Sequence, residues 1–280
     1  MAAGMQAADV VIVGGAAVGS AVAYFLTAKG FTGSIAIVER DPGYQSCATA
    51  RSAGGIRSQF SNPENIRLSR ASLAIIRELG LEAEVGFREQ GYLILASERG
   101  RATLAANHAV QLAEGADVVI EVGDALMARF AWLATDGIAC GALGRSGEGW
   151  IDPVSLMAAL RKRARDAGVS LLRGEVTHIE RANGAITSAV LADGTRIACG
   201  ALVNAAGPQA PMVPGRPHRD GLIEHRHDRE VAQISFDPRG VRIVTCALKH
   251  LEQNQVADQN LIILVLDGGL QPEHGATGLP

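Results

Sequence analysis

The chain has few cysteines, little net charge and no long apolar run, and each absence argues against a class of protein. The four cysteines, Cys47, Cys140, Cys199 and Cys246, lie far apart and follow neither a metal-ligand spacing nor a disulfide-rich pattern. We therefore expect no metal centre and a reducing, cytoplasmic compartment. A formal net charge of −3 gives no reason to expect nucleic acid or an anionic membrane as a partner.

Membrane insertion and secretion are not expected either. No stretch reaches the length of a membrane span without a glycine or a charge. The residues from Val10 to Leu26 are apolar enough to resemble a signal peptide, but no Lys or Arg precedes them and glycines interrupt them. Aromatic residues make up only 4% of the chain, whereas glycine is abundant at 33 residues. This composition suits an α/β protein with many tight turns, and 280 residues are enough for a sizeable core.

The pattern of residues 9–39 predicts a strand, a glycine-rich turn, a helix and a second strand. In residues 9–13, the four residues after Asp9 are apolar and β-branched, which is typical of a buried parallel strand. Residues 17–29 have a helical pattern that Gly30 ends, and residues 34–38 form the second apolar run. Together these elements make one βαβ half-unit.

The turn between the first strand and the helix nearly matches the glycine fingerprint of a dinucleotide-binding site. In that fingerprint the first glycine permits the tight turn, the middle one lets the backbone approach a pyrophosphate, and the third lets helix and strand pack closely. Here the middle position is Ala16, which we expect to be tolerated if its φ is negative. The pyrophosphate would lie on the N–H groups at the helix start. The expected contacts are Gly14, Gly15, Ala16, Ala17, Val18 and Gly19.

Glu39 follows the second strand, where an acid accepts hydrogen bonds from ribose hydroxyls and disfavours the 2′-phosphate of NADP. Arg40 comes directly after it and is also a candidate cofactor contact. A glycine-rich turn of an α/β fold that holds no ligand is the alternative interpretation of this region.

The next stretch, "ERDPGYQSCATARSAGGIRSQFS" at residues 39–61, resembles the D-amino-acid oxidase superfamily of FAD-dependent amine oxidoreductases, which includes glycine oxidase, sarcosine oxidases and dimethylglycine dehydrogenase. The resemblance implies FAD as the cofactor and a small-residue segment that passes the pyrophosphate and the flavin ring. That segment comprises Thr49, Ala50, Arg51, Ser52, Ala53, Gly54 and Gly55. A flexible Ser/Gly/Ala loop is the alternative.

The resemblance also assigns a substrate contact and a second cofactor anchor. It implies that Arg57 pairs with a substrate carboxylate, for which the guanidinium fork is suited; a solvated surface arginine is the alternative. It implies that the backbone of Val176 contacts the adenine and that the turn of "ALVNAAGP" returns to the pyrophosphate through Ala205, Ala206 and Gly207. No histidine lies near residues 47–57 to form a covalent link, so the FAD is expected to be non-covalent.

The expected fold is α/β: a Rossmann-like FAD-binding domain with an inserted, incomplete α+β substrate domain. Residues 1–80 and 150–210 form the FAD-binding domain, and residues 81–149 begin the substrate domain. Residues 211–280 match nothing we recognise, which is consistent with a divergent, truncated or frame-altered segment. Its histidines, His225 and His227, lack a partnering acid or cysteine pattern, so a metal site there is not expected.

The resemblance implies oxidation of the C–N bond of a small amine or amino acid by hydride transfer to flavin, with oxygen or another acceptor reoxidising the flavin. An FAD-binding or scaffold protein without catalytic activity is the alternative, since fold alone does not establish chemistry. An NAD-dependent dehydrogenase would need a second nicotinamide-binding half, for which residues 60–150 show no βαβ signal. The substrate and the oligomeric state stay open.

Overall fold

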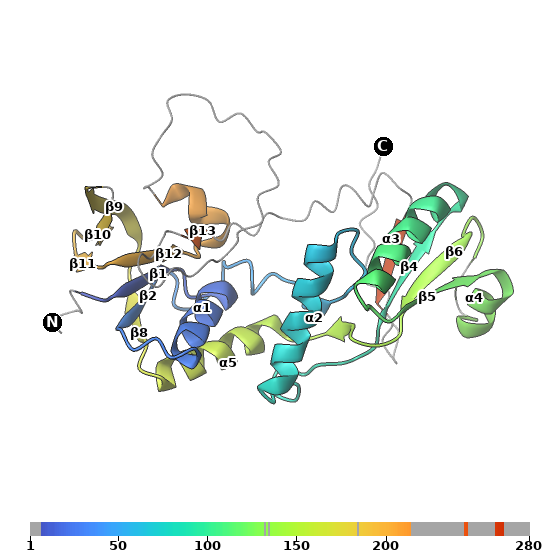
Figure 1. Ribbon diagram of the computed structural model, residues 1–280, viewed down its shortest axis with the longest axis horizontal. Helices are drawn as coiled ribbons and strands as arrows, with labels where there is room; N and C mark the ends of the chain where they lie inside the picture. The colour runs from blue at the N-terminus through green and yellow to red at the C-terminus, as the bar shows by residue number, and fades with distance from the viewer. Residues whose placement is uncertain are drawn as a thin grey trace, which may run out of the picture. The chain divides into compact units, whose positions relative to one another are not determined.

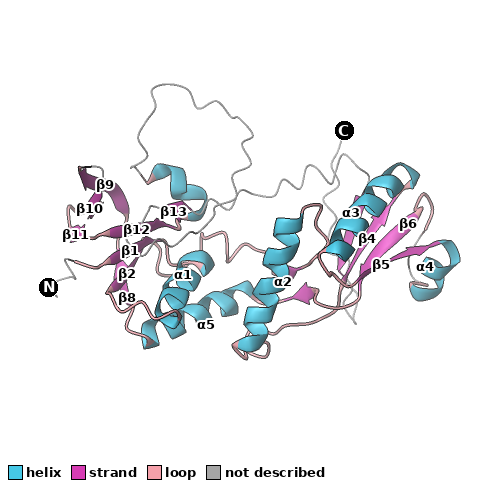
Figure 2. Cartoon of the chain, in the orientation of Figure 1, coloured by secondary structure: helices cyan, strands magenta, loops and turns pink. Residues whose placement is uncertain are grey.

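A computed structural model describes residues 7–131, 133, 135–183, 185–213, 244–245 and 261–265. The chain divides into two compact units, one of residues 1–52 with 153–249 and the other of residues 53–152 with 250–280. Figure 1 labels the elements along the chain, and Figure 2 distinguishes helices from strands. The fold is α/β, as the sequence predicts, with a parallel sheet in the first unit and an antiparallel sheet in the second.

The first unit is built on a five-stranded sheet in the order β13-β12-β1-β2-β8, and every neighbouring pair in it is parallel. Its strands are β1 (Val10–Val13), β2 (Ile35–Glu39), β8 (Ser170–Arg173), β12 (Ala201–Asn204) and β13 (Val244–Thr245). β1 lies between β2 and β12, with Val10 in register with Ile35 on one side and Ala201 on the other. The carboxyl ends of these three strands therefore meet at the same edge.

Both faces of the parallel sheet are buried, which explains why its strands are continuous apolar runs. On one face Ile12, Ile35 and Ile37 share a core with Ala23 of helix α1 (Ala17–Ala28) and Ala164 of helix α5 (Pro153–Asp166). The alternate residues point to the other face because side chains alternate along a strand.

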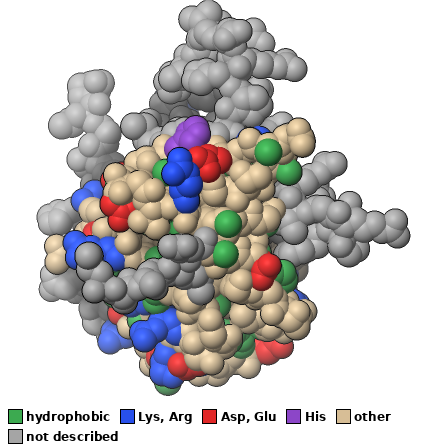
Figure 3. Space-filling view, turned by 90° about the vertical axis from the view of Figure 1, so that its left-hand side faces the viewer, with side chains coloured by type: hydrophobic (Ala, Val, Ile, Leu, Met, Phe, Trp, Pro, Cys, Tyr) green, Lys and Arg blue, Asp and Glu red, His purple; other side chains and the backbone are tan. Residues whose placement is uncertain are grey.

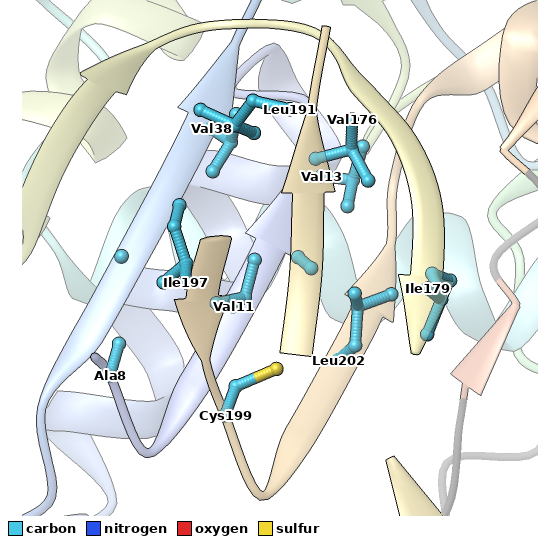
Figure 4. Packing of buried hydrophobic residues seen from close by; sticks show 12 residues of the cluster. Ala8, Val11, Val13, Val38, Val176, Ile179, Leu191, Ile197, Cys199 and Leu202 are labelled. Carbon is cyan, nitrogen blue, oxygen red and sulfur yellow. The ribbon is translucent and has the colours of Figure 1, made fainter. Parts of the chain in front are cut away.

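A three-stranded antiparallel meander covers that second face. It consists of β9 (Val176–Ala182), β10 (Ala185–Leu191) and β11 (Arg196–Ala198), in the order β11-β10-β9. Figure 4 shows Val11 and Val38 of the parallel sheet within the same apolar cluster as Leu191 and Ile197 of the meander.

The second unit has a four-stranded antiparallel sheet in the order β14-β4-β6-β5. Its strands are β4 (Tyr92–Ala96), β5 (Val118–Val122), β6 (Cys140–Gly144) and β14 (Leu261–Val265). The helices are α2 (Pro63–Glu78), α3 (Arg101–Ala113) and α4 (Gly123–Arg129). A short ribbon pairs β3 (Gly55–Ile56) with β7 (Gly149–Trp150). Single 3₁₀ turns lie at Glu98–Gly100 and Gly207–Met212.

Local signals placed most of the longer elements. Asn62 caps α2 by accepting a hydrogen bond from the Asn65 N–H at 3.0 Å, and Pro63 takes the first helical position. Sequence patterns did not locate β6, whose sequence CGALG lacks β-branched residues, nor the seven-residue helix α4.

The boundary between the compact units falls between Ser52 and Ala53. Residues 53–80, including α2, therefore belong to the second unit, whereas the sequence grouped residues 1–80 with the FAD-binding domain. The assignment of functions to the two units stays a prediction. Most of the expected divergent segment, residues 211–280, including His225 and His227, lies outside the described residues.

Among the described helices, none is long and apolar enough to cross a bilayer. Within the same described ranges, no group of three or more His, Cys, Asp or Glu side chains is arranged to hold a metal ion. Acidic and basic side chains are interspersed on the face drawn in Figure 3.

Candidate functional site

The turn after β1 requires a glycine at its first position. Gly14 has a φ of +95°, a backbone conformation that disfavours any side chain. Its N–H donates to the Val38 carbonyl at 2.8 Å, which ties the turn to β2. A Cβ atom on Gly14 would lie 2.5 Å from the carbonyl oxygen of Ala205. The turn after β1 and the turn after β12 are therefore in direct backbone contact.

The start of α1 also packs closely against the turn after β1. A Cβ atom on Gly19 would overlap the Gly14 carbonyl oxygen, so only glycine allows this approach. Ala16 has φ −69° and ψ −165°, which meets the condition under which we expected alanine to be tolerated at the middle position. The side chain of Ala16 offers no oxygen to cap the helix, and no acidic residue lies in the first turn. The N-cap residue therefore leaves the N–H groups of the helix start to other partners, among them the Thr49 hydroxyl and an external anion.

Glu39 reaches back to the glycine turn. Its Oε2 accepts the Gly15 N–H at 2.8 Å, and its Oε1 accepts the Asp41 N–H, also at 2.8 Å. A carboxylate has about four lone-pair directions, so each oxygen can still accept a further hydrogen bond. The residue expected to bind a ribose thus also holds the turn to the end of β2.

The second turn, after β12, is built around a residue that the sequence analysis missed. Asn204 is buried; its Oδ1 accepts the Ala206 N–H at 3.2 Å and its Nδ2 donates to the Ala210 carbonyl at 2.8 Å. The Ala205 N–H donates to the Val13 carbonyl at 2.8 Å, and Gly207 has a φ of +58°. In the sequence, the position of a polar asparagine at the end of an apolar strand was the signal that could have identified this residue.

The segment after β2 is joined to the helix start through Thr49. The Thr49 Oγ1 accepts the Ala17 N–H at 3.3 Å. Cys47 has a local role, because its Sγ accepts the Ala50 N–H at 3.3 Å. Arg51 is exposed, as is Arg40, which forms an ion pair with Glu175 at 3.4 Å. Val176, whose backbone was expected to contact adenine, buries its side chain in the meander core.

The remaining candidates lie in the second unit, where Gly55 pairs with Trp150 in the β3–β7 ribbon. This group comprises Ala53, Gly54, Gly55 and Arg57. A Cβ atom on Gly55 would overlap the Tyr92 hydroxyl, which explains the glycine. The Arg57 guanidinium lies 5.0 Å from the centre of the Phe60 ring. Within the first unit, the structure brings together the candidates Gly14–Gly19, Glu39, Thr49 and Ala205. The second group of candidates belongs to the other compact unit.

A buried carboxyl group holds the Arg57 segment. Glu148 is fully buried; its Oε1 accepts the Ser58 N–H at 2.6 Å and its Oε2 accepts a hydrogen bond from Gln59 Nε2 at 2.9 Å. Burial raises the pKa of the Glu148 carboxyl, while hydrogen bonds from Gln59 and Ser58 and the charge of Arg57 act in the opposite direction. An isolated glutamate between two glycines carries no pattern that would have identified it.

These features fit a dinucleotide cofactor. Two glycine-containing turns meet at the carboxyl edge of a parallel sheet, and the turn after β1 leads into a helix whose N-cap residue offers no side-chain cap. Open α/β sheets bind their ligands at this edge, with the pyrophosphate on the helix N-terminus. The fold and this site define a dinucleotide-binding α/β protein.

Comparisons with known proteins identify the family. A family model described as "FAD dependent oxidoreductase" matches residues 9–267, which extends beyond residue 208, where the resemblance found in the sequence ends. The chain belongs to this family of FAD-dependent oxidoreductases, and FAD is its cofactor.

Three relatives illustrate the similarity. "FAD-dependent oxidoreductase domain-containing protein 1" from Xenopus laevis is 42% identical over 188 residues, covering 63% of this chain and 38% of that protein. Glycine oxidase from Bacillus cereus matches with a TM-score of 0.60 and 26% identity over 72% of this chain and 56% of that one. L-proline dehydrogenase from P. horikoshii has a TM-score of 0.67 and 23% identity, with coverage of 75% and 55%. The chain thus spans about two fifths of the curated relative's length.

Proposed function

We propose that the chain oxidises the C–N bond of a small amine or amino acid in an FAD-dependent reaction. The observation that carries this proposal is the backbone contact between Gly14 and Ala205, which forms a two-sided cradle at the helix start. The similarity to glycine oxidase at 26% identity supports an amino acid or a related amine as the substrate class. When bound, FAD supplies the acceptor for a hydride from the carbon next to the amine nitrogen.

The chain's own residues have binding and orienting roles in this proposal. The N–H groups of residues 16, 18 and 19 and the turn at Ala205–Gly207 would hold the pyrophosphate, and the free lone pairs of Glu39 would accept the ribose hydroxyls. The Ala53–Gly55 segment would lie along the flavin, and Arg57 would receive a substrate carboxylate as a bidentate pair. The FAD would be held without a covalent bond, and oxygen or another acceptor would take the electrons in a cytoplasmic setting.

The test is the visible absorption spectrum of the purified protein after reconstitution with FAD, followed by anaerobic addition of amino acids and N-methyl amines. We expect a flavin band that survives gel filtration, is lost after acid precipitation of the protein, and bleaches with at least one of these compounds. Arg57→Lys is expected to lower the affinity for a substrate with a carboxylate more than the affinity for the corresponding amide, because lysine lacks the planar guanidinium fork.

Three results would contradict the proposal in different ways. A stable flavin band that no amine bleaches would favour an FAD-binding protein without this activity. If Arg57→Lys does not change the bleaching, the proposed contact between Arg57 and the substrate is wrong. Turnover with NAD in the absence of flavin would overturn the proposed reaction class.

A further inference from the structure

A cavity in the first unit borders the glycine turn, because its lining residues Glu39 and Tyr44 both lie next to Gly15. It has a volume of about 290 Å³ and is lined by residues of β2, α5 and β8 and of the loop after β2. Among the described residues that line it, Glu39 is the only acidic one, whereas Arg161, Arg165 and Arg173 supply three positive charges. The lining therefore has a net positive charge even with Glu39 ionised.

The fold brings these arginines together from two elements. Arg161 and Arg165 are four residues apart on α5, so they lie on the same side of the helix. Arg173 is in register with Glu39 in the parallel β2–β8 pair, and partners in register point to the same face of a sheet. Since α5 covers that face, all three side chains converge on one place.

None of the three arginines forms an ion pair with a carboxylate in the part of the chain that the structure describes. The carboxylate of Glu39 already accepts the N–H groups of Gly15 and Asp41. Lys162, by contrast, lies on the same helix and is paired with Asp166 at 2.6 Å. A helix C-terminus favours basic residues in its last turn, but Arg161 lies before that turn and Arg173 lies on a strand.

Arg161 also has a buried donor without an acceptor. Its guanidinium lies 4.5 Å from the centre of the Tyr44 ring, and its Nη1 atom is inaccessible and has no hydrogen-bond partner among the described residues. Because this atom is inaccessible, the other nitrogens of the Arg161 guanidinium would have to contact an anion in the cavity. Guanidinium groups that lack a carboxylate are well suited to phosphate.

We propose that this arginine cavity binds a small phosphate-bearing anion at a site separate from the FAD pyrophosphate. The cavity is at the low end of the range for small-molecule sites, so a compact phosphate ester fits better than a dinucleotide. Its lining includes no residue of the glycine turn, but Glu39 contributes to both places, so the anion borders the ribose side of the FAD site. The distinction between the two sites rests on the proposed role of the glycine turn.

The test is calorimetric titration of the FAD-saturated full chain with inorganic phosphate at low ionic strength. We expect saturable binding that weakens about fivefold or more in Arg165→Gln and in Arg173→Gln, because each variant removes a charge-assisted contact. Lys162→Gln is the matched control, since Lys162 lies on the same helix but does not line the cavity. The phosphate affinity of this variant should match that of the unmodified chain. FAD content and thermal unfolding of each variant establish that it is folded.

Two outcomes would overturn the inference. Phosphate that binds only to FAD-free protein would assign the cavity to the FAD site, and equal weakening by Lys162→Gln would show a general charge effect. If the chain does not retain FAD, the proposed function fails. The comparison of Arg165→Gln and Arg173→Gln with Lys162→Gln on FAD-free protein then decides the arginine cavity: weakening in the two arginine variants alone supports it, and equal affinities in all three overturn it.

Discussion

At the scale of single residues, the glycine turn tolerates alanine at one position and excludes it at two others. Ala16 has extended backbone with a negative φ, so its methyl group causes no strain. Gly14 and Gly19 have no such freedom, because each lies against another backbone segment. The departure from the glycine fingerprint is therefore compatible with the fold, and the two retained glycines carry the close contacts.

Gly19→Ala should impair both folding and cofactor retention. The added methyl group would overlap the Gly14 carbonyl, so the helix start must shift away from the turn. Overpacking of this kind typically costs about 1–3 kcal/mol. Denaturant unfolding and the FAD-to-protein ratio after gel filtration would measure the effect. Ala16→Gly is the control and should keep both properties, whereas full FAD retention in Gly19→Ala would contradict the packing argument.

Glu39→Gln should loosen the turn even without FAD. A glutamine has only one acceptor oxygen, so its amide nitrogen must face either the Gly15 or the Asp41 N–H. We expect a loss of about 1 kcal/mol in unfolding free energy and a weaker FAD affinity. Glu175→Gln is the control: its exposed ion pair with Arg40 at 3.4 Å should contribute little to stability. Equal effects in the two variants would refute a special role for Glu39.

At the scale of elements, short loops determine how the second unit is held together. The loop around Gly147 carries Glu148, which binds the Ser58–Gln59 segment from inside. Its neighbour Gly147 donates its N–H to Glu89 Oε1 at 2.6 Å, and Glu89 also pairs with Arg77 at 2.9 Å. Two carboxyl groups thus fix the same loop, one in the core and one at the surface.

These two carboxyl groups should give stability profiles of opposite sign. Burial raises the pKa of Glu148, so its contribution is full below the unfolded pKa and is lost as pH rises toward the folded one. The Gly147 N–H, together with Arg77, lowers the pKa of Glu89, so its contribution is present at neutral pH and is lost as pH falls.

Urea unfolding of the second unit from about pH 4 to pH 7 would measure both contributions, since free glutamate titrates near pH 4.3. Glu148→Gln should reduce the decrease in unfolding free energy that occurs as pH rises from 4 to 7, because glutamine does not ionise. Glu89→Gln should instead lower stability near pH 7 and leave it little changed at acid pH. If Glu148→Gln leaves the pH slope unchanged, the carboxyl group does not titrate as burial requires.

At the scale of the whole molecule, the candidate FAD contacts are divided between two compact units. The glycine turn, Glu39 and Ala205–Gly207 belong to the first unit, and Ala53–Gly55 with Arg57 belong to the second. In the proposed function, the anchoring of the pyrophosphate would therefore be a property of the parallel-sheet unit. Any selectivity for the substrate through Arg57 would be a property of the other unit.

FAD should stabilise the first unit more than the second. At about 100 times its dissociation constant a ligand adds roughly 2.7 kcal/mol to the stability of the state that binds it. Amide hydrogen exchange with and without FAD should show the larger gain in protection in β1 and β12, compared with β5 and β6. A larger gain in the second unit would place the main FAD contacts there.

The sequence by itself determined the first βαβ unit and the cofactor class. The buried parallel strands and the glycine turn depend on residues close together in the chain, so local patterns predict them. The small-residue segment after Glu39 and the turn near Ala205 added the resemblance that pointed to FAD.

Only the tertiary structure decided which distant residues meet. Gly14 lies against Ala205, Glu148 holds Ser58 and Arg161 stacks on Tyr44, and each pair joins segments far apart in the chain. No local pattern contains such contacts, because they arise when strands pair in register and helices cover a sheet. The conformation of Ala16, the second role of Glu39 and the convergence of Arg161 with Arg173 are therefore properties of the fold.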